Sequence, residues 1–203
     1  MAVQSDYRYS LTVNGSSQFE VVRFVLKEHL STLFRLELDL ASFGAEPNFH
    51  SLIDQPATLT FWQGDEAVRS VNGIVTALNQ GETGFTRTRY HMVIEPSLCR
   101  AGLQTDLRIF QQQDSQKIIE TLLSKNQVSQ SQFHLQTPYW TREYCVQYRE
   151  TDLNFIQRLA AEEGSYYYFE HTNNSHILHF SNSTTLSEKK GNLVYNAMPA
   201  GQR

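Results

Sequence analysis

Apolar and polar residues alternate with a period of two through most of the first half of the chain. The clearest example runs from Leu33 to Leu40, where apolar and charged residues take turns. The apolar side chains are Phe34, Leu36, Leu38 and Leu40, and the charged ones are Arg35, Glu37 and Asp39. Because successive side chains of a strand point to opposite faces, this alternation predicts a half-buried β-strand.

Other segments before Pro96 share this strand pattern. They are Arg8–Val13, Phe19–Lys27, Ala57–Trp62, Ser70–Leu78 and Thr88–Ile94. Turn residues separate them at short intervals, which favours an antiparallel sheet that closes into a barrel and so removes its exposed edges. Residues 42–55 contain Gly and Pro, and we expect a long loop with one helical turn there. The first domain is therefore predicted to be an antiparallel β-barrel over residues 1–95.

The period changes after Pro96. Asp114 and Ser115 can cap a helix that runs to about Lys125, and its apolar face consists of Ile118, Ile119, Leu122 and Leu123. Short strands are expected at residues 133–136 and 144–148, and Asn173-Asn174 is typical of the turn in a hairpin. These elements predict an α+β domain over residues 97–182.

The last residues, 183–203, are expected to form a loop and the start of a following region. Ser183 to Gly191 is polar, and Leu193 to Tyr195 could be a short strand. The ending MPAGQR contains nothing that caps or closes a domain, so we expect the chain to be part of a longer protein.

The segment REYCVQYRETDLNFIQRLAAEEGSYYYFEH, residues 142–171, carries strand, helix and strand signals in succession. Thr151 stands at the N-cap position, where its hydroxyl can accept a hydrogen bond from a backbone N–H of the first turn. Asp152 adds a negative charge to that turn. Gly164 follows the last helical residue and can take the left-handed conformation that ends a helix. This segment is therefore predicted to be a β-α-β unit.

Composition narrows the class of protein. Of the 203 residues, 40% are hydrophobic and 19% are charged, which is typical of a globular chain. The 17 basic and 21 acidic residues give a net charge of −4 without a run of Lys or Arg, so nucleic acid is not expected as a partner. The sequence lacks a signal peptide and lacks an apolar stretch of the roughly 18 residues that a membrane helix needs. We expect synthesis and folding in the cytoplasm.

Candidate metal ligands and carboxylate pairs do not form a coherent site. His176 and His179 should project to opposite faces of a strand, and His171 would have to reach across the hairpin, so we interpret all three as strand-surface histidines. Glu162 and Glu163 occupy adjacent helix positions that point in different directions, which favours a solvated helix end over a catalytic pair.

The cysteines and the known catalytic motifs lead to the same conclusion. Cys99 and Cys145 have no metal-ligand spacing, and we expect both to be reduced, buried and apolar rather than disulfide-bonded or nucleophilic. The sequence contains no P-loop, Rossmann, GxSxG or HExxH pattern. We therefore expect no catalytic residue, no metal and no cofactor.

Aromatic residues gather in the last third of the chain. They are Tyr139, Trp140, Tyr144, Tyr148, Tyr166, Tyr167, Tyr168 and Phe169. Such rings can build a core, a subunit interface or a sugar-stacking platform, and core is favoured for at least half of them. Strand alternation sends Tyr166 and Tyr168 to one face and Tyr167 and Phe169 to the other, so one pair should face the predicted helix.

The motif of residues 142–171 closely resembles the VgrG spike proteins of the bacterial type VI secretion system, which are related to the baseplate hub of contractile-tailed phages. The resemblance extends to Leu107-Arg108-Ile109-Phe110-Gln111 with the following helix, to FRLELDLAS and to Leu193–Ala197, so it covers nearly the whole chain. Ser165 departs from the pattern, because the family more often has a bulky apolar residue after the glycine.

The resemblance implies a structural role. Such proteins are trimers whose hub regions form a ring on hexameric tube protein, followed by an oligonucleotide/oligosaccharide-binding-like domain and a β-helical needle. In the related phage hub each subunit contributes two similar barrels, and a second domain is inserted between them. Residues 1–95 would be the first barrel and residues 97–182 the inserted domain. The second barrel and the needle would lie mainly beyond Arg203.

The resemblance also implies partners and a location. The expected partners are two further copies in a homotrimer, the hexameric tube protein, effector or adaptor proteins, and the target-cell envelope through the needle. The protein would assemble in the bacterial cytoplasm and then be secreted or translocated into target cells. Arg35, Glu37 and Asp39 are candidate contacts to subunits or tube, although a solvated barrel face is at least as well supported.

Two other functions compete with the spike-hub interpretation. The aromatic-rich second domain could be a glycan- or peptidoglycan-binding module. An enzyme is the other alternative, and the lack of a coherent triad, carboxylate pair or metal cluster in the sequence argues against it.

Overall fold

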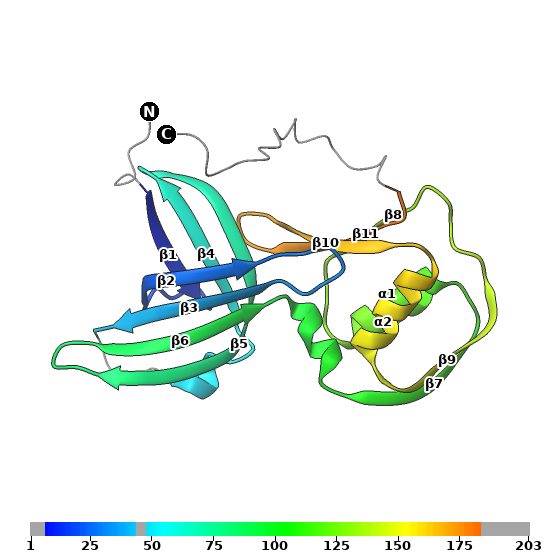
Figure 1. Ribbon diagram of the computed structural model, residues 1–203, viewed down its shortest axis with the longest axis horizontal. Helices are drawn as coiled ribbons and strands as arrows, with labels where there is room; N and C mark the ends of the chain where they lie inside the picture. Colours follow the sequence, from blue (N-terminus) through cyan, green and yellow to red (C-terminus); the bar gives the residue numbers. More distant parts are fainter. Residues whose placement is uncertain (1–6, 44–47, 184–203) are drawn as a thin grey trace, which may run out of the picture.

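The computed structural model describes residues 7–43 and 48–183. Figure 1 shows a curled β-sheet at one end of the molecule and, at the other, a smaller part in which two helices lie between strands. This arrangement confirms the predicted fold class, in which antiparallel β structure precedes an α+β region. The expectations for residues 184–203, including the strand at Leu193–Tyr195, lie outside the described residues.

Six strands in the described part of the chain form the curled sheet, and all of its pairs are antiparallel. They are β1 (Tyr7–Val13), β2 (Glu20–Lys27), β3 (Arg35–Ser42), β4 (Pro56–Gln63), β5 (Glu66–Thr83) and β6 (Thr88–Glu95). Their order is β1-β4-β5-β6-β3-β2. The predicted helical turn between β3 and β4 is present as a short 3-10 helix, η2 (Phe49–Ser51).

The sheet curls around a hydrophobic cluster and forms a half-barrel. The inward side chains of β3, such as Leu36 and Leu38, are fully buried in this cluster. Within the described chain β1 and β2 each pair with one other strand, so backbone hydrogen bonds do not complete a barrel. Instead, the ring of Tyr9 in β1 lies 5.1 Å from that of Phe24 in β2, and both rings contact Phe61. Side-chain packing therefore brings the two edge strands together.

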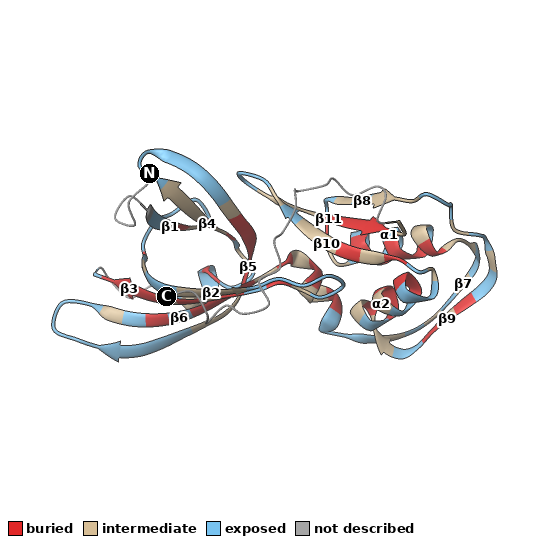
Figure 2. Cartoon of the chain, turned by 45° about the horizontal axis from the view of Figure 1, so that its top comes forward, coloured by how far each residue is buried: buried red, intermediate tan, exposed pale blue. Residues whose placement is uncertain are grey.

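The second part begins after Pro96 with a 3-10 helix, η3 (Ser97–Gly102). Its helices are α1 (Ser115–Lys125) and α2 (Asp152–Glu162). Its strands are β7 (Thr105–Gln113), β8 (Ser131–His134), β9 (Arg142–Thr151), β10 (Tyr166–His171) and β11 (His176–Ser181). The sheets β10-β11-β8 and β7-β9 lie on opposite sides of the helices (Figure 1). Each helix has a buried side and an exposed side (Figure 2).

Both predicted helix starts are confirmed. The Asp114 side chain accepts a hydrogen bond from the Lys117 backbone N–H at 2.8 Å and caps α1. The Thr151 hydroxyl accepts one from the Asn154 N–H at 3.1 Å and caps α2. Each bond satisfies one of the N–H groups that the first turn of a helix leaves without a partner.

Gly164 ends α2 as the sequence predicts. Its φ is +66°, its N–H donates to the Ala161 carbonyl at 3.0 Å, and the Ser165 N–H donates to the Ala160 carbonyl at 2.8 Å. This is the Schellman arrangement of a helix C-terminus. The same pair of bonds ends α1, but there Gln127 occupies the left-handed position with φ +57°. Both helices therefore end in the same conformation. In α2 the left-handed position holds glycine, which favours it, and in α1 it holds glutamine, which does not.

We expect Gly164→Val to lower the free energy of unfolding by about 1–3 kcal/mol, because a β-branched residue is strained at positive φ. A Cβ at this position would meet no atom within 4 Å, so the loss would come from the backbone and not from a clash. Chemical denaturation measures the change. Gln127→Gly is the matched variant, and it should shift stability in the opposite direction. An unchanged unfolding midpoint for Gly164→Val would contradict the role of its conformation.

Two hydrophobic clusters fill the two parts of the molecule and meet at Phe169, which packs against both. Backbone groups also join them, because the Ser31 N–H donates to the Tyr167 carbonyl at 2.8 Å. Asn72 of β5 is 3% exposed, and its side-chain amide donates to the carbonyls of Thr172 at 2.6 Å and Ser175 at 2.9 Å. The hairpin of β10 and β11 is thus fastened to the half-barrel. The division into domains at residue 96 stays a prediction.

Candidate functional site

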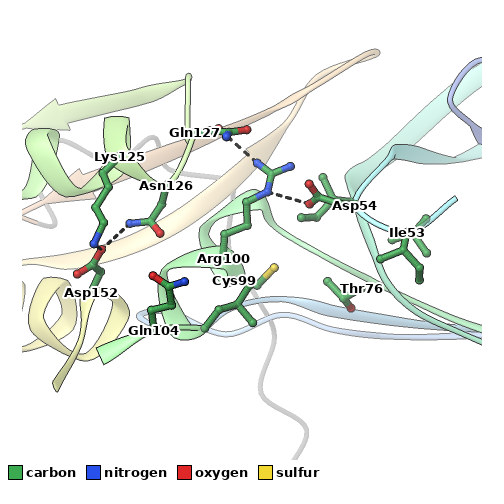
Figure 3. Close-up of a pocket in the computed structure, with 13 residues that line it drawn as sticks. Ile53, Asp54, Thr76, Cys99, Arg100, Gln104, Lys125, Asn126, Gln127 and Asp152 are labelled. Carbon is green, nitrogen blue, oxygen red and sulfur yellow. Dashed lines mark hydrogen bonds and ion pairs between the residues drawn. The ribbon is translucent and has the colours of Figure 1, made fainter. Parts of the chain in front are cut away.

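A cavity of about 510 Å³ lies where the two parts meet. Figure 3 shows its lining, which comes from the loop before β4, from β5, from η3 and from the C-terminal end of α1. The Nε of Arg100 donates to Asp54 at 2.8 Å, and an Nη of the same side chain donates to the Gln127 carbonyl at 3.5 Å. Arg100 therefore links η3 to both walls of the cavity.

Asp152 carries the buried charge in this cavity. It accepts hydrogen bonds from Gln147 and Asn126, both at 2.8 Å, and lies 2.9 Å from the Lys125 ammonium. Burial opposes its ionisation, but these donors outweigh burial and lower the pKa of Asp152 below its usual value. The carboxylate is therefore ionised and fully engaged at neutral pH.

The cysteine in the cavity is not activated. Burial raises the pKa of the Cys99 thiol to about 11, so it stays protonated at neutral pH. Cys99 is half-buried and Cys145 is buried, and neither is in a disulfide. The expectation of two unpaired cysteines is confirmed, although Cys99 is less buried than expected. The charged groups around the cavity hold the chain together and do not assemble a nucleophile with a base.

The histidines of the β10–β11 hairpin are not on the surface, contrary to our interpretation of the sequence. His171 and His176 face each other across the hairpin, and both pack against Phe34 of the half-barrel. The Asn72 N–H donates to Nδ1 of His171 at 3.1 Å, and the Ser97 N–H donates to Nε2 of His176 at 3.3 Å. The sequence pattern does not indicate this burial, because the burial arises from contact between segments that are distant in the sequence.

His179 is also buried, on the other face of the hairpin. Its Nδ1 lies 2.8 Å from Nε2 of His134, its Nε2 lies 3.0 Å from a carboxylate oxygen of Glu170, and its ring stacks on Tyr168. Burial lowers the pKa of His179. Within the described residues no group of three or more His, Cys, Asp or Glu side chains is placed to hold a metal ion.

Stability should fall as the pH is lowered from 7 to 5. Burial lowers the pKa of His176 to about 4, so the unfolded chain, with a pKa of about 6.5, binds a proton that the folded chain excludes. Stability is therefore complete above pH 6.5 and is lost as the pH falls toward 4. His176 alone should account for about 2 kcal/mol between pH 7 and pH 5.

The variant His176→Gln isolates this effect, because its amide oxygen can accept the Ser97 hydrogen bond without titrating. It should be less stable than the parent at pH 7 and should have a shallower dependence on pH in thermal melts. His50→Gln, at an exposed position, is the control and should follow the parent curve. Parallel curves for the parent and His176→Gln would show that His176 does not titrate in this range.

Glu162 is exposed, as the predicted solvated helix end requires, whereas Glu163 is half-buried. Both carboxylates bind the guanidinium of Arg142, at 2.8 Å and 2.6 Å, and the Ser115 hydroxyl donates to Glu163 at 2.6 Å. This cluster joins β9 to the end of α2 and the start of α1. The sequence gives no signal for it, because Arg142 reaches the glutamates only after the chain folds back.

The predicted polar contacts on β3 lie on the outer surface of the half-barrel. Arg35 donates to Glu37 at 2.8 Å and to Glu95 of β6 at 3.0 Å. The hydrogen bond from Arg35 lowers the pKa of Glu37. Asp39 lies 3.0 Å from Nδ1 of His91. Arg35 and Asp39 therefore pair with residues of β6, Glu37 pairs with Arg35 within β3, and the contact of these three residues with other proteins stays a prediction.

The aromatic residues divide between core and surface. Tyr167 is 1% exposed and packs in the second hydrophobic cluster with Phe169 beside it, which confirms that one pair of the YYYF segment faces inward. Tyr166 and Tyr168 lie on the other face, where they are half-buried and stack on each other. Their rings therefore contact their own sheet more than solvent.

One exposed apolar surface on this part of the molecule was only partly indicated by the sequence pattern. Tyr144 and Tyr148 of β9 are 65% and 64% exposed, and Leu107 and Ile109 of β7 are 61% and 67% exposed. Pairing places Leu107 opposite Tyr148, and Ile109 opposite the half-buried Val146. We call this surface, made of these five residues, the β7–β9 face. In β7 the apolar Leu107 and Ile109 flank the charged Arg108, and this alternation indicates that the two apolar side chains share one face.

None of the helices in the described residues is both long enough and apolar enough to span a membrane. Residues 27–203 match the profile of the phage tail baseplate hub (GPD) family. This chain belongs to that family. The match includes segments of both parts of this chain, from β3 through the β10–β11 hairpin.

Named relatives agree with this assignment. This chain is 38% identical over 201 residues to the type VI secretion system spike protein VgrG2a of Pseudomonas aeruginosa. The alignment covers 98% of this chain and 24% of the relative. This chain is also 38% identical over 169 residues to the actin cross-linking toxin VgrG1 of Vibrio cholerae, covering 83% of this chain and 15% of the toxin. The hub chain thus spans less than a quarter of the length of either relative.

A solved structure is similar as well. The E. coli c3393 protein, described as a type VI secretion component that is structurally similar to the T4 phage tail proteins gp27 and gp5, superposes with a TM-score of 0.81. The two are 25% identical, and the alignment covers 88% of the hub chain and 50% of the E. coli chain. The predicted resemblance to VgrG proteins and the phage-hub-like fold are confirmed.

Proposed function

We propose that this chain is the hub region of a type VI secretion spike protein, a structural subunit that joins the tip of the secretion tube to the spike. The observation that carries the proposal is the similarity to VgrG2a over 98% of the chain. Residues 1–95 would be the first barrel of the hub and residues 97–182 the domain inserted after it. The two hydrophobic clusters support this division.

The role we propose is mechanical and not catalytic. Two charged clusters are engaged in internal contacts: Arg142 binds its two glutamates, and Asp152 binds its three donors. The relative named as an actin cross-linking toxin is more than six times as long as the aligned segment, since that segment is 15% of its length. We assign any toxin activity to regions outside the hub.

The proposed partners are two further copies of the protein, the hexameric tube protein, and effector or adaptor proteins. The spike would assemble in the bacterial cytoplasm and leave the cell through the secretion system to reach the target-cell envelope. A glycan-binding role is less well supported, because Tyr166 and Tyr168 are half-buried and stack within their own sheet.

The test uses a complete spike protein that carries this chain. Light scattering should give the mass of a trimer, and the trimer should co-sediment with assembled tube protein. Substituting Arg35, Glu37 and Asp39 with alanine tests whether β3 contributes to tube binding. A protein that remains monomeric at high concentration would refute the hub proposal.

A further inference from the structure

In an ordinary surface strand pair the apolar side chains face the core, but on the β7–β9 face they point outward. In β7 the apolar residues Leu107 and Ile109 point outward and are more than half exposed, whereas Arg108 between them is half-buried. The inner side of the ribbon is occupied, since Phe110 and Cys145 pack into the cluster with the helices. The chain therefore places apolar side chains on the outside without needing them for its own core.

The size and composition of the β7–β9 face fit one side of a specific protein interface. Two tyrosines and two aliphatic side chains that are each about two-thirds exposed present on the order of 400–500 Å². An interface takes about 800 Å² from each partner, and a little over half of it is apolar. Aromatic rings at the centre of such a surface are the side chains that contribute most to binding.

A bulge in β9 adds a cation at the rim of this face. The register between β7 and β9 shifts at Asp106 and Leu107, which leaves Arg149 as the extra residue, with φ +52°. Its guanidinium lies 5.5 Å from the centre of the Tyr148 ring, and within the described residues it is in no ion pair. The face therefore needs a partner with an apolar patch and a nearby carboxylate.

We propose that the β7–β9 face binds a neighbouring copy of this chain in the assembled spike. A second copy offers both, because Val22 and Val68 on its half-barrel are about half exposed and an exposed glutamate precedes each by two residues in the same strand, Glu20 in β2 and Glu66 in β5. A ring of three requires two different surfaces to meet at each contact, so the β7–β9 face would pack on another surface of the neighbour. The inference rests on the proposed hub function and specifies one of its subunit contacts.

The test places the photoreactive amino acid benzoylphenylalanine at position 148 of the complete spike protein, in place of Tyr148. Irradiation of the trimer should yield an adduct between two copies. Position 30 is the matched control, because Leu30 is 64% exposed, close to the value for Leu107, but lies in the loop between β2 and β3, outside β7 and β9. Leu107→Arg should reduce the position-148 adduct about tenfold, and Leu30→Arg should leave it unchanged. Thermal melts of both variants should match the parent, because neither side chain is in the core.

The possible results of this experiment distinguish failure of the inference from failure of the proposed hub function. If the protein is a trimer and position 148 cross-links only to tube or effector protein, or to nothing, the β7–β9 face does not bind a neighbouring copy and the inference is wrong, while the hub function stands. If the protein is monomeric, both fail. An adduct that persists in Leu107→Arg would also overturn the inference, because the apolar face would then not be needed for the contact.

Discussion

The variant Gly73→Ala should unfold with a free energy about 3 kcal/mol lower than that of the parent, a larger loss than adding one methyl group to most core positions causes. Gly73 lies in the middle of β5, and a Cβ built there would lie 2.5 Å from the Glu95 carbonyl oxygen and 2.6 Å from a methyl group of Ile94. Backbone of β6 supplies the nearer atom, so the two strands would have to separate. For a chain of this size the loss corresponds to a melting temperature roughly 6–12 °C lower.

Gly81→Ala is the control for this prediction. Gly81 belongs to the same strand, and its Cβ would meet its nearest neighbour at an ordinary distance of 3.5 Å. Its substitution should be neutral, or stabilising by a few tenths of a kcal/mol because alanine restricts the unfolded chain. Equal melting temperatures for the two variants would show that β5 and β6 can move apart without cost.

The variant Asn72→Leu should also lose about 3 kcal/mol, for a different reason. Leucine has a similar volume, but it removes the hydrogen bonds to the Thr172 and Ser175 carbonyls, and each hydrogen bond contributes about 0.5–1.5 kcal/mol. The Thr172 carbonyl loses this donor, whereas the Ser175 carbonyl keeps the Thr172 N–H at 2.8 Å. The substitution also removes the acceptor of the Thr58 hydroxyl, which donates to the Asn72 side chain at 2.8 Å. The loss should concentrate at the junction, so the amides of the β10–β11 hairpin should exchange with solvent faster than those of β3 and β6.

Asn79→Leu provides the comparison, because Asn79 is in the same strand and is exposed. Its effect should stay within about 0.5 kcal/mol of the parent. If hydrogen exchange in Asn72→Leu rises evenly through the whole molecule, the two parts unfold together. The Asn72 side-chain amide then does not stabilise the junction specifically.

The sequence predicted those elements whose signals are local. Strands of the half-barrel follow from alternation, because one side of the sheet faces a core, and both helices follow from their caps and apolar stripes. The inward turn of Tyr167 followed from the same alternation. These features depend on neighbours within a few residues, which a single sequence records.

Contacts between distant segments could not be predicted in this way. The burial of His171 and His176 depends on packing against Phe34, more than a hundred residues earlier in the chain. The outward orientation of the apolar residues of β7 could not be predicted, because alternation does not indicate which face of a strand meets the core. The interpretation of Glu163 as solvated failed because Arg142 reaches it only after the chain folds. Each of these features depends on contacts with residues that are distant in the sequence, or on which face of a strand meets the core.

The layered second part has a mechanical consequence. The β7–β9 ribbon rests on α1 and α2, the helices rest on the sheet of β10, β11 and β8, and the hairpin of that sheet is held by Asn72 to the central region of β5. A push on the ribbon is therefore transmitted across three stacked layers into the middle of the half-barrel, and the single covalent connection at Pro96 does not carry it alone. In the hub role that we propose, a load on the ribbon would therefore be spread over several non-covalent contacts between the two parts.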